Sequence, residues 1–165
     1  MKKNLLYFLL LTSSFLLPAG CSPSDTVYEG SVDFAGGKWL RFEPHELKVD
    51  IPNADDCYEL IITAVIDTAL YHQSALPLTL KVTSGQGETR TLFADLLLHA
   101  RDGHSLGQPD AGSRLVFTQR VREYFYFNTK GTHTVTIGQR TSRYEIDGIQ
   151  RLTFTVRKAH IELPQ

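Results

Sequence analysis

Cys21 is the residue of this sequence with the clearest chemical use, because of the segment that precedes it. The chain begins with Lys2 and Lys3, continues with a mostly apolar stretch from residue 5 to residue 17, and then reads Pro-Ala-Gly-Cys at residues 18–21. A basic start, an apolar middle and small residues before a cleavage site are the parts of a secretory signal. The stretch is interrupted by hydroxyl residues and is short for a membrane-spanning helix, which needs roughly 20 apolar residues. We therefore expect residues 1–20 to be a cleaved signal peptide.

The small residues before Cys21 match the lipobox of bacterial lipoproteins, although Pro18 stands where that pattern usually has Leu. In that pattern the thiol accepts a lipid, with palmitate among its acyl chains, and each buried methylene contributes about 0.8 kcal/mol to membrane binding. The pattern predicts no cofactor other than this covalent lipid, and a short tether over residues 21–26. It also predicts a protein of the cell envelope, anchored to the inner or outer membrane, with its domain in the periplasm or at the cell surface. The alternative is an ordinary signal peptide followed by an incidental cysteine.

Charge and cysteine content narrow the class of protein further. Loss of the signal would leave 15 Lys and Arg residues against 18 Asp and Glu residues, a net charge of −3. This argues against a nucleic-acid partner, which usually needs a basic face. The only other cysteine is Cys57, so a lipidated Cys21 leaves it without a disulfide partner. Cys57 is then either a small apolar residue near the core or a reactive thiol.

The remaining sequence predicts strands. Apolar and polar residues alternate with the period of a strand in three segments, 78–83, 134–137 and 152–157. Residues 58–66 carry apolar residues on both faces of the predicted strand, which is typical of a central strand covered on both sides. Residues 92–100 are the one helix-like segment, and a strand is the preferred interpretation there. We predict an all-β fold, a single antiparallel β-sandwich of jelly-roll or immunoglobulin-like type, over residues 27–165.

Turn residues separate the predicted strands. Gly103, Gly131 and Gly148 lie in short polar segments, where a positive φ would suit a turn. The longest irregular stretch covers residues 100–113, and loops of this length often carry function.

Catalytic and metal-binding patterns are weak. His99 and His104 lie near Asp95 and Asp102, but their spacing matches no ligand motif, and a metal site would need three or more converging ligands. The sequence has no nucleophile elbow and no phosphate-binding loop. We therefore predict no catalytic residues, no metal and no enzyme activity. A hydrolase that uses the region from Asp95 to His104 is the least favoured alternative.

Aromatic and polar residues provide the candidate partner-binding set. In the run from Tyr124 to Phe127, strand alternation places two rings on each face. We expect Trp39 to close one end of the sandwich, and Gln139 and Arg140 to end a strand, where they could bond loop carbonyls or a partner. The predicted partner-binding residues are Trp39, Tyr71, Tyr124, Tyr126, Gln139 and Arg140. The same aromatic rings could instead stack on sugars in a surface carbohydrate-binding module.

A series of short patterns runs along the chain. Its pieces are Cys21, Lys38-Trp39, Tyr58 with Leu60 and Ile62, Tyr71, Leu78 with Leu80 and Val82, Asp102-Gly103 with Leu106-Gly107, Phe127 with Gly131, Val135 and Ile137, Gln139-Arg140, and Asp147-Gly148-Ile149. Together these pieces resemble the gliding-motility lipoprotein GldH family of Bacteroidetes. In that family Met usually stands between the Gln and Arg that are adjacent here. The resemblance implies a non-enzymatic envelope lipoprotein that belongs to, or assists, the gliding and linked secretion machinery, with other envelope proteins as partners.

Overall fold

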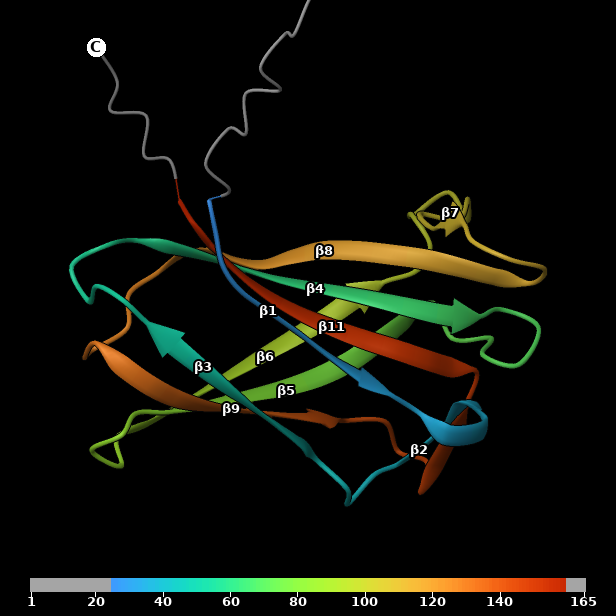
Figure 1. The fold of residues 1–165 in the computed structure, drawn as a ribbon. Helices are drawn as coiled ribbons and strands as arrows, with labels where there is room; N and C mark the ends of the chain where they lie inside the picture. Colours follow the sequence, from blue (N-terminus) through green and yellow to red (C-terminus); the bar gives the residue numbers. More distant parts are fainter. Residues whose placement is uncertain (1–24, 160–165) are drawn as a thin grey trace, which may run out of the picture.

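Two antiparallel sheets face each other across one apolar core in the computed structural model, which describes residues 25–159 (Figure 1). One sheet has the strand order β1-β11-β4-β8-β7, the other has the order β3-β9-β5-β6, and a short β10–β2 ribbon lies at one end. The described residues contain no α-helix. The elements are β1 (Thr26–Asp33), the 3-10 turn η1 (Ala35–Gly37), β2 (Lys38–Leu40), β3 (His45–Ile51), β4 (Tyr58–Asp67), β5 (Ala75–Thr83), β6 (Thr89–Leu97), β7 (Gln108–Pro109), β8 (Arg114–Phe125), β9 (Gly131–Gln139), β10 (Glu145–Asp147) and β11 (Ile149–Lys158).

The predicted all-β sandwich is confirmed, and the alternating segments are strands of it. Segments 78–83, 134–137 and 152–157 lie in β5, β9 and β11, where buried side chains recur at every second position. The helix-like segment 92–100 lies mostly in the edge strand β6. Burial of one face of each strand on the shared core explains why the period-two pattern located these strands.

Strand β4 is central in its sheet, as predicted, but only one of its faces is fully buried. Its inward side chains, from Tyr58 to Ile66, lie in the core, while its outward side chains are half-exposed. Ile61 and Val65 face outward among the side chains of neighbouring strands, and the described residues place no second layer over them. The prediction of a cover on both faces is therefore wrong, because β-branched residues also suit an uncovered sheet face.

Of the predicted segment boundaries, only the end of the tether falls within the described residues. Strand β1 begins at Thr26, the last residue of the expected tether. The expected signal peptide, residues 1–20, and the expected lipid-bearing Cys21 lie outside the described residues. Among the described residues, no helix has the length and apolar character that crossing a membrane requires.

The sandwich has two ends, which we name by their position relative to the described termini. At the terminal end β1 begins and β11 ends (Figure 1). Here Thr26 pairs with Arg157, and Tyr58 pairs with both Lys158 and Phe125. The distal end carries the β10–β2 ribbon and the loops that leave β4, β6 and β9.

Trp39 closes the core at the distal end. Its ring is 1% exposed and packs on the rings of Phe34 and His45, with centroids 4.8 and 5.9 Å away. Its Nε1 donates a hydrogen bond to the Glu43 carbonyl oxygen at 3.1 Å. The expected closure of one end is confirmed. The prediction that Trp39 contacts a partner is corrected, because a ring buried this fully offers no surface.

Candidate functional site: a cleft at the distal end

The predicted partner-binding residues separate into two groups. Trp39, Tyr71, Gln139 and Arg140 lie at the distal end, whereas Tyr124 and Tyr126 lie at the terminal end. Like Trp39, Tyr71 and Gln139 are buried, each 5% exposed. The prediction that these two contact a partner directly is therefore corrected in the same way, and Arg140, Tyr124 and Tyr126 are the members that reach the surface.

The distal end contains a cleft of about 270 Å³ between the loop that follows β4 and the loop that follows β9. Two of the predicted residues, Tyr71 and Arg140, line it. Most of the other side chains in the lining are polar, so the cleft suits a ligand or partner segment with hydrogen-bonding groups. The remaining lining residues are Leu70, His72, Gln73, Pro77, Thr141, Ser142, Arg143, Ile146 and Asp147.

Tyr71 forms a fixed wall of this cleft. Its hydroxyl donates a hydrogen bond to the Ala75 carbonyl oxygen at 2.9 Å. Burial raises the pKa of Tyr71 to about 12, against a smaller opposing effect of the Arg143 charge. The phenol therefore stays protonated at neutral pH, with its proton engaged by the backbone, and Tyr71 shapes the cleft without serving as a base.

Arg140 connects the end of β9 to two neighbouring strands. Its Nη2 binds the Asp95 carboxylate at 2.9 Å, and its Nε donates a long hydrogen bond, 3.4 Å, to the Leu78 carbonyl oxygen. The guanidinium also lies over the Phe93 ring, 5.2 Å from its centroid. The expectation that Arg140 bonds a loop carbonyl is corrected, because the carbonyl that it contacts belongs to strand β5. Arg140 thus holds one side of the cleft on the outer face of the four-stranded sheet.

The buried Gln139 side chain holds the first residues of the loop that follows β9, next to the cleft. Its Oε1 accepts hydrogen bonds from the Thr141 backbone N–H at 2.8 Å and from the Thr141 hydroxyl at 2.6 Å. Among the described residues its buried Nε2 has no hydrogen-bond partner. The side chain therefore fixes the start of the β9–β10 loop, which carries the lining residues Thr141 to Arg143.

A second set of contacts joins the distal loops. The Ser113 hydroxyl donates a hydrogen bond to Asp67 Oδ1 at 2.6 Å, and this bond lowers the pKa of the Asp67 carboxyl. The Asp67 N–H donates to the Gly148 carbonyl oxygen at 2.7 Å. These contacts place the loop after β4 against β10 and complete the cleft.

The positive φ expected at three glycines is confirmed. Gly103, Gly131 and Gly148 have φ values of 89, 98 and 95°.

Two exposed rings stand next to the cleft on the same end. Phe42 is 73% exposed and Tyr144 is 65% exposed, and their centroids lie 6.1 Å apart. The Arg41 guanidinium lies 5.6 Å from the Phe42 centroid, and Tyr144 follows the lining residue Arg143. The predicted set did not include these residues. Phe42 carried one signal, an apolar side chain in a turn just before Pro44.

In the histidine region of the hydrolase alternative, His104 lies against Asp102, whereas Asp95 engages another residue. Asp102 Oδ1 binds His104 Nδ1 at 2.6 Å, with both side chains largely exposed. Asp95 instead engages Arg140. Within residues 25–159 no three His, Cys, Asp or Glu side chains gather in a way that could hold a metal ion. The loop 100–113 is partly ordered by the His99–Ser105 bridge and by strand β7.

At the terminal end, the run from Tyr124 to Phe127 alternates as expected. Phe125 and Phe127 are buried, whereas Tyr124 is 57% and Tyr126 is 50% exposed. Cys57 is buried beside Tyr126, in agreement with its interpretation as a small apolar residue, and a hydrogen bond with Cys57 raises the pKa of Tyr126. Arg90 lies over the Phe125 ring and donates to the Tyr126 carbonyl oxygen.

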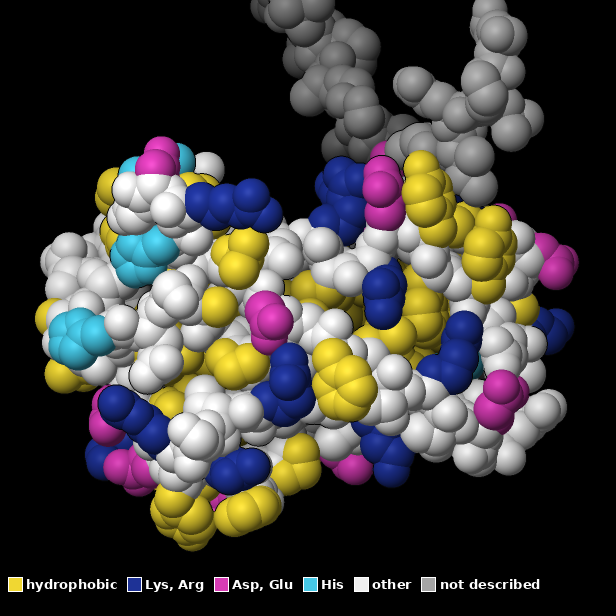
Figure 2. Space-filling view, turned by 180° about the vertical axis from the view of Figure 1, so that it is seen from behind, with side chains coloured by type: hydrophobic (Ala, Val, Ile, Leu, Met, Phe, Trp, Pro, Cys, Tyr) yellow, Lys and Arg dark blue, Asp and Glu magenta, His cyan; other side chains and the backbone are white. Residues whose placement is uncertain are grey.

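Exposed hydrophobic side chains therefore occur at both ends of the molecule. In Figure 2 such side chains project at the lower left, on the side of the β10–β2 ribbon, and at the upper right, on the side where β11 ends. Exposed apolar groups beside arginines are typical of surfaces that bind other molecules. In the comparison with known proteins, no family model and no curated protein matches the chain.

Proposed function

We propose that this protein is a non-enzymatic lipoprotein of the bacterial cell envelope that binds a partner protein at its distal end. The observation that carries the proposal is the cluster of exposed Phe42 and Tyr144 beside Arg41 and the cleft. Aromatic and arginine side chains supply most of the binding energy in protein interfaces, where they are strongly enriched. The cluster is therefore the best candidate contact surface of the distal end.

The sequence supports the envelope location. The segment 1–20 has the parts of an export signal, and Cys21 follows the small residues of a lipobox. We propose that lipid on Cys21 attaches the chain to the inner or outer membrane, with the sandwich in the periplasm or at the cell surface. The series of patterns from Lys38-Trp39 to Asp147-Gly148-Ile149 supports a role like that of the GldH family, as a component or accessory of the gliding and secretion machinery.

The structure also supplies a reason to favour binding over catalysis. Tyr71 engages its proton with a backbone carbonyl, and Arg140 is paired with Asp95. These two cleft residues therefore contribute shape and fixed hydrogen bonds, whereas general acid–base chemistry needs a group that is positioned to exchange a proton.

Site-specific cross-linking in intact cells tests the proposal. A photo-reactive phenylalanine analogue placed at Tyr144 should form an adduct with one defined envelope protein, identified by mass spectrometry. The matched control places the analogue at Thr91, an exposed residue on the outer face of β6, where we expect no adduct. Tyr144→Ala should also reduce co-purification of the same protein after gentle detergent extraction. Recovery of the lipoprotein alone under all of these conditions would contradict a partner at this end.

A carbohydrate-binding module is the second candidate, and the polar lining of the cleft favours it. His72, Gln73, Thr141, Ser142 and Asp147 offer hydrogen-bonding groups of the kind that bind sugar hydroxyls. Trp39 and Tyr71 are buried and cannot stack on a sugar, so Tyr144 would supply the stacking ring. A glycan array probed with the mature domain should then show hits that Tyr144→Ala removes. An array without hits would eliminate this candidate.

A further inference from the structure

We propose that the terminal end of the sandwich rests on the lipid surface, with Tyr124 and Tyr126 at the level of the headgroups. This inference rests on the proposed attachment of lipid to Cys21. It adds an orientation, namely which end of the domain faces the bilayer, and it assigns a second interaction surface whose partner is the membrane itself.

The first argument is the length of chain between the lipid and the fold. Only residues 22–25 separate Cys21 from Thr26, where β1 begins. A fully extended chain spans at most about 3.5 Å per residue, so Thr26 lies within about 17 Å of an anchored Cys21. The start of β1 is thereby held close to the membrane surface, and the terminal end is the part of the sandwich that the membrane meets.

The second argument is the position of the two tyrosines relative to that attachment. In the five-stranded sheet only β11 and β4 separate β1 from β8. Neighbouring strands are about 4.8 Å apart, so the chain at Phe125 lies roughly 14 Å across the sheet from the start of β1. This lateral distance does not exceed the maximum reach of the tether. Tyr124 and Tyr126 are thus within range of the same patch of lipid.

The third argument is chemical. Tyrosine rings concentrate at the boundary between lipid and water, because the ring is apolar and the hydroxyl bonds to water or headgroups. Tyr124 and Tyr126 project while their neighbour Phe125 is buried, so the end of β8 and the residue after it present amphipathic rings outward and keep the apolar ring in the core. Because the Tyr126 hydroxyl bonds to Cys57, Tyr124 is the residue whose hydroxyl we assign to the headgroups. Lys158 is also at this end, and Asp56 binds its Nζ at 2.7 Å. That pairing reduces the repulsion between Asp56 and anionic headgroups.

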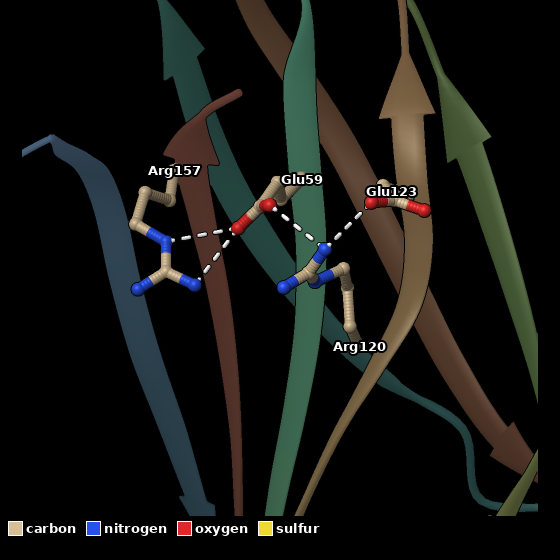
Figure 3. Close-up of polar contacts among 4 residues, drawn as sticks. All are labelled: Glu59, Arg120, Glu123 and Arg157. Atoms are coloured by element: carbon tan, nitrogen blue, oxygen red, sulfur yellow. Dashed lines mark hydrogen bonds and ion pairs between the residues drawn. The ribbon is translucent and has the colours of Figure 1, made fainter. Parts of the chain in front are cut away.

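A cross-strand network holds this part of β8 in place. Glu59 of β4 lies between Arg157 of β11 and Arg120 of β8, and Arg120 also binds Glu123 (Figure 3). Glu59 accepts hydrogen bonds from Arg157 Nε and Nη2 at 3.0 and 2.8 Å, and its carboxylate lies 3.2 Å from Arg120 Nη1. The register of β8 shifts here, between its pairings at Ile61 and Tyr58. Such irregularities redirect side chains at sheet margins, and the network fixes the segment that presents Tyr124.

Depth-dependent fluorescence quenching tests the inference. Lipidated Tyr124→Trp protein would be reconstituted into phosphatidylethanolamine–phosphatidylglycerol vesicles that contain phosphatidylcholine brominated on its acyl chains. We expect the tryptophan at position 124 to lose emission relative to vesicles without bromine. Tyr126→Trp should behave in the same way and provides a second probe if the first variant folds poorly.

The matched control is Tyr144→Trp, because Tyr144 has a similar exposure but lies at the distal end. Its emission, and that of the native Trp39, should not respond to bromine. Quenching at position 144 would overturn the proposed orientation. So would an absence of quenching at positions 124 and 126 while the protein floats with the vesicles. Neither result would contradict the proposed lipid anchor. A protein that does not float would overturn the proposed anchor and this inference together. Shielding of position 124 from aqueous acrylamide only in native membranes, with no bromine effect, would identify a protein as the occupant and also overturn it.

Discussion

His45 links the packing of the distal end to pH. Its ring makes an edge contact with Phe34, with centroids 5.0 Å apart, and it packs beside Trp39. Burial lowers the pKa of His45, against a smaller opposing effect of the Glu43 charge. The unfolded chain, with a pKa of about 6.5, therefore binds a proton more readily than the folded one. The stability that His45 contributes is complete above pH 6.5 and is lost as the pH falls below that value.

Urea unfolding at pH 7.5 and at pH 5.5 measures this effect. The native protein should lose more stability between the two conditions than His45→Gln, which has no proton to gain. The comparison of the two proteins removes the contributions of the other histidines. Equal losses in both proteins would show that His45 titrates alike in the folded and unfolded states.

Glu59 is the second residue for which a sharp outcome is expected. Its carboxylate is 13% exposed and lies between two guanidinium groups. Glu59→Gln removes the charge and leaves Arg157 and Arg120 with weaker partners, so we expect a loss of about 1–3 kcal/mol in the free energy of unfolding. The matched control is Glu123→Gln, whose side chain is 56% exposed and should cost less than about 0.5 kcal/mol. Equal losses of unfolding free energy in the two variants would mean that the Glu59 network stabilises the fold no more than a surface ion pair does.

At the scale of the elements, the junction of β10 and β11 is the point where the distal end depends on one glycine. Gly148 has a φ of 95°, and a Cβ there would lie 2.8 Å from the Asp67 carbonyl oxygen and 3.0 Å from the Tyr71 Cβ. Gly148→Ala should therefore destabilise the protein by about 1–3 kcal/mol and disturb the cleft. Gly87 has a φ of 87° with no atom near its added Cβ, so Gly87→Ala carries only the backbone cost. Thermal unfolding should show the larger loss for Gly148→Ala, and equal losses would rule out the steric contact.

The strands could be predicted from sequence because one face of each is buried, as in Leu78, Leu80 and Val82 of β5. Whether a second layer covers β4 could not be predicted, since Ile61 and Val65 look the same in sequence whether a layer or water lies above them. The exposure of individual site residues was also not predictable from sequence. Tyr71 and Tyr124 have the same side chain, but the loop after β4 turns one inward while the strand margin turns the other outward. Exposure depends on tertiary contacts that local patterns do not contain.

At the scale of the whole molecule, the proposed lipid anchor is a property that one substitution can test. In the sequence Cys21 precedes β1, the first strand of the sandwich, so Cys21→Ala should leave thermal unfolding of the domain unchanged. It should move the protein from the membrane fraction to the soluble fraction, because the proposed acyl chains would supply most of the membrane affinity. Fractionation of cells that express either form measures this outcome. Persistent membrane association of the variant would contradict a lipid anchor at this residue.

The position of both described termini at one end has a mechanical consequence. Strand β4 has ten residues and spans about 33 Å, and the cleft lies beyond its distal end. In the orientation proposed above, a partner embedded in the same membrane would have to extend a domain to about that height to reach Tyr144. Tethering to a surface also confines both molecules to a thin layer, which raises their effective concentration. A weak contact at the cleft would then suffice, and the same contact would be hard to detect once the two proteins are released into solution.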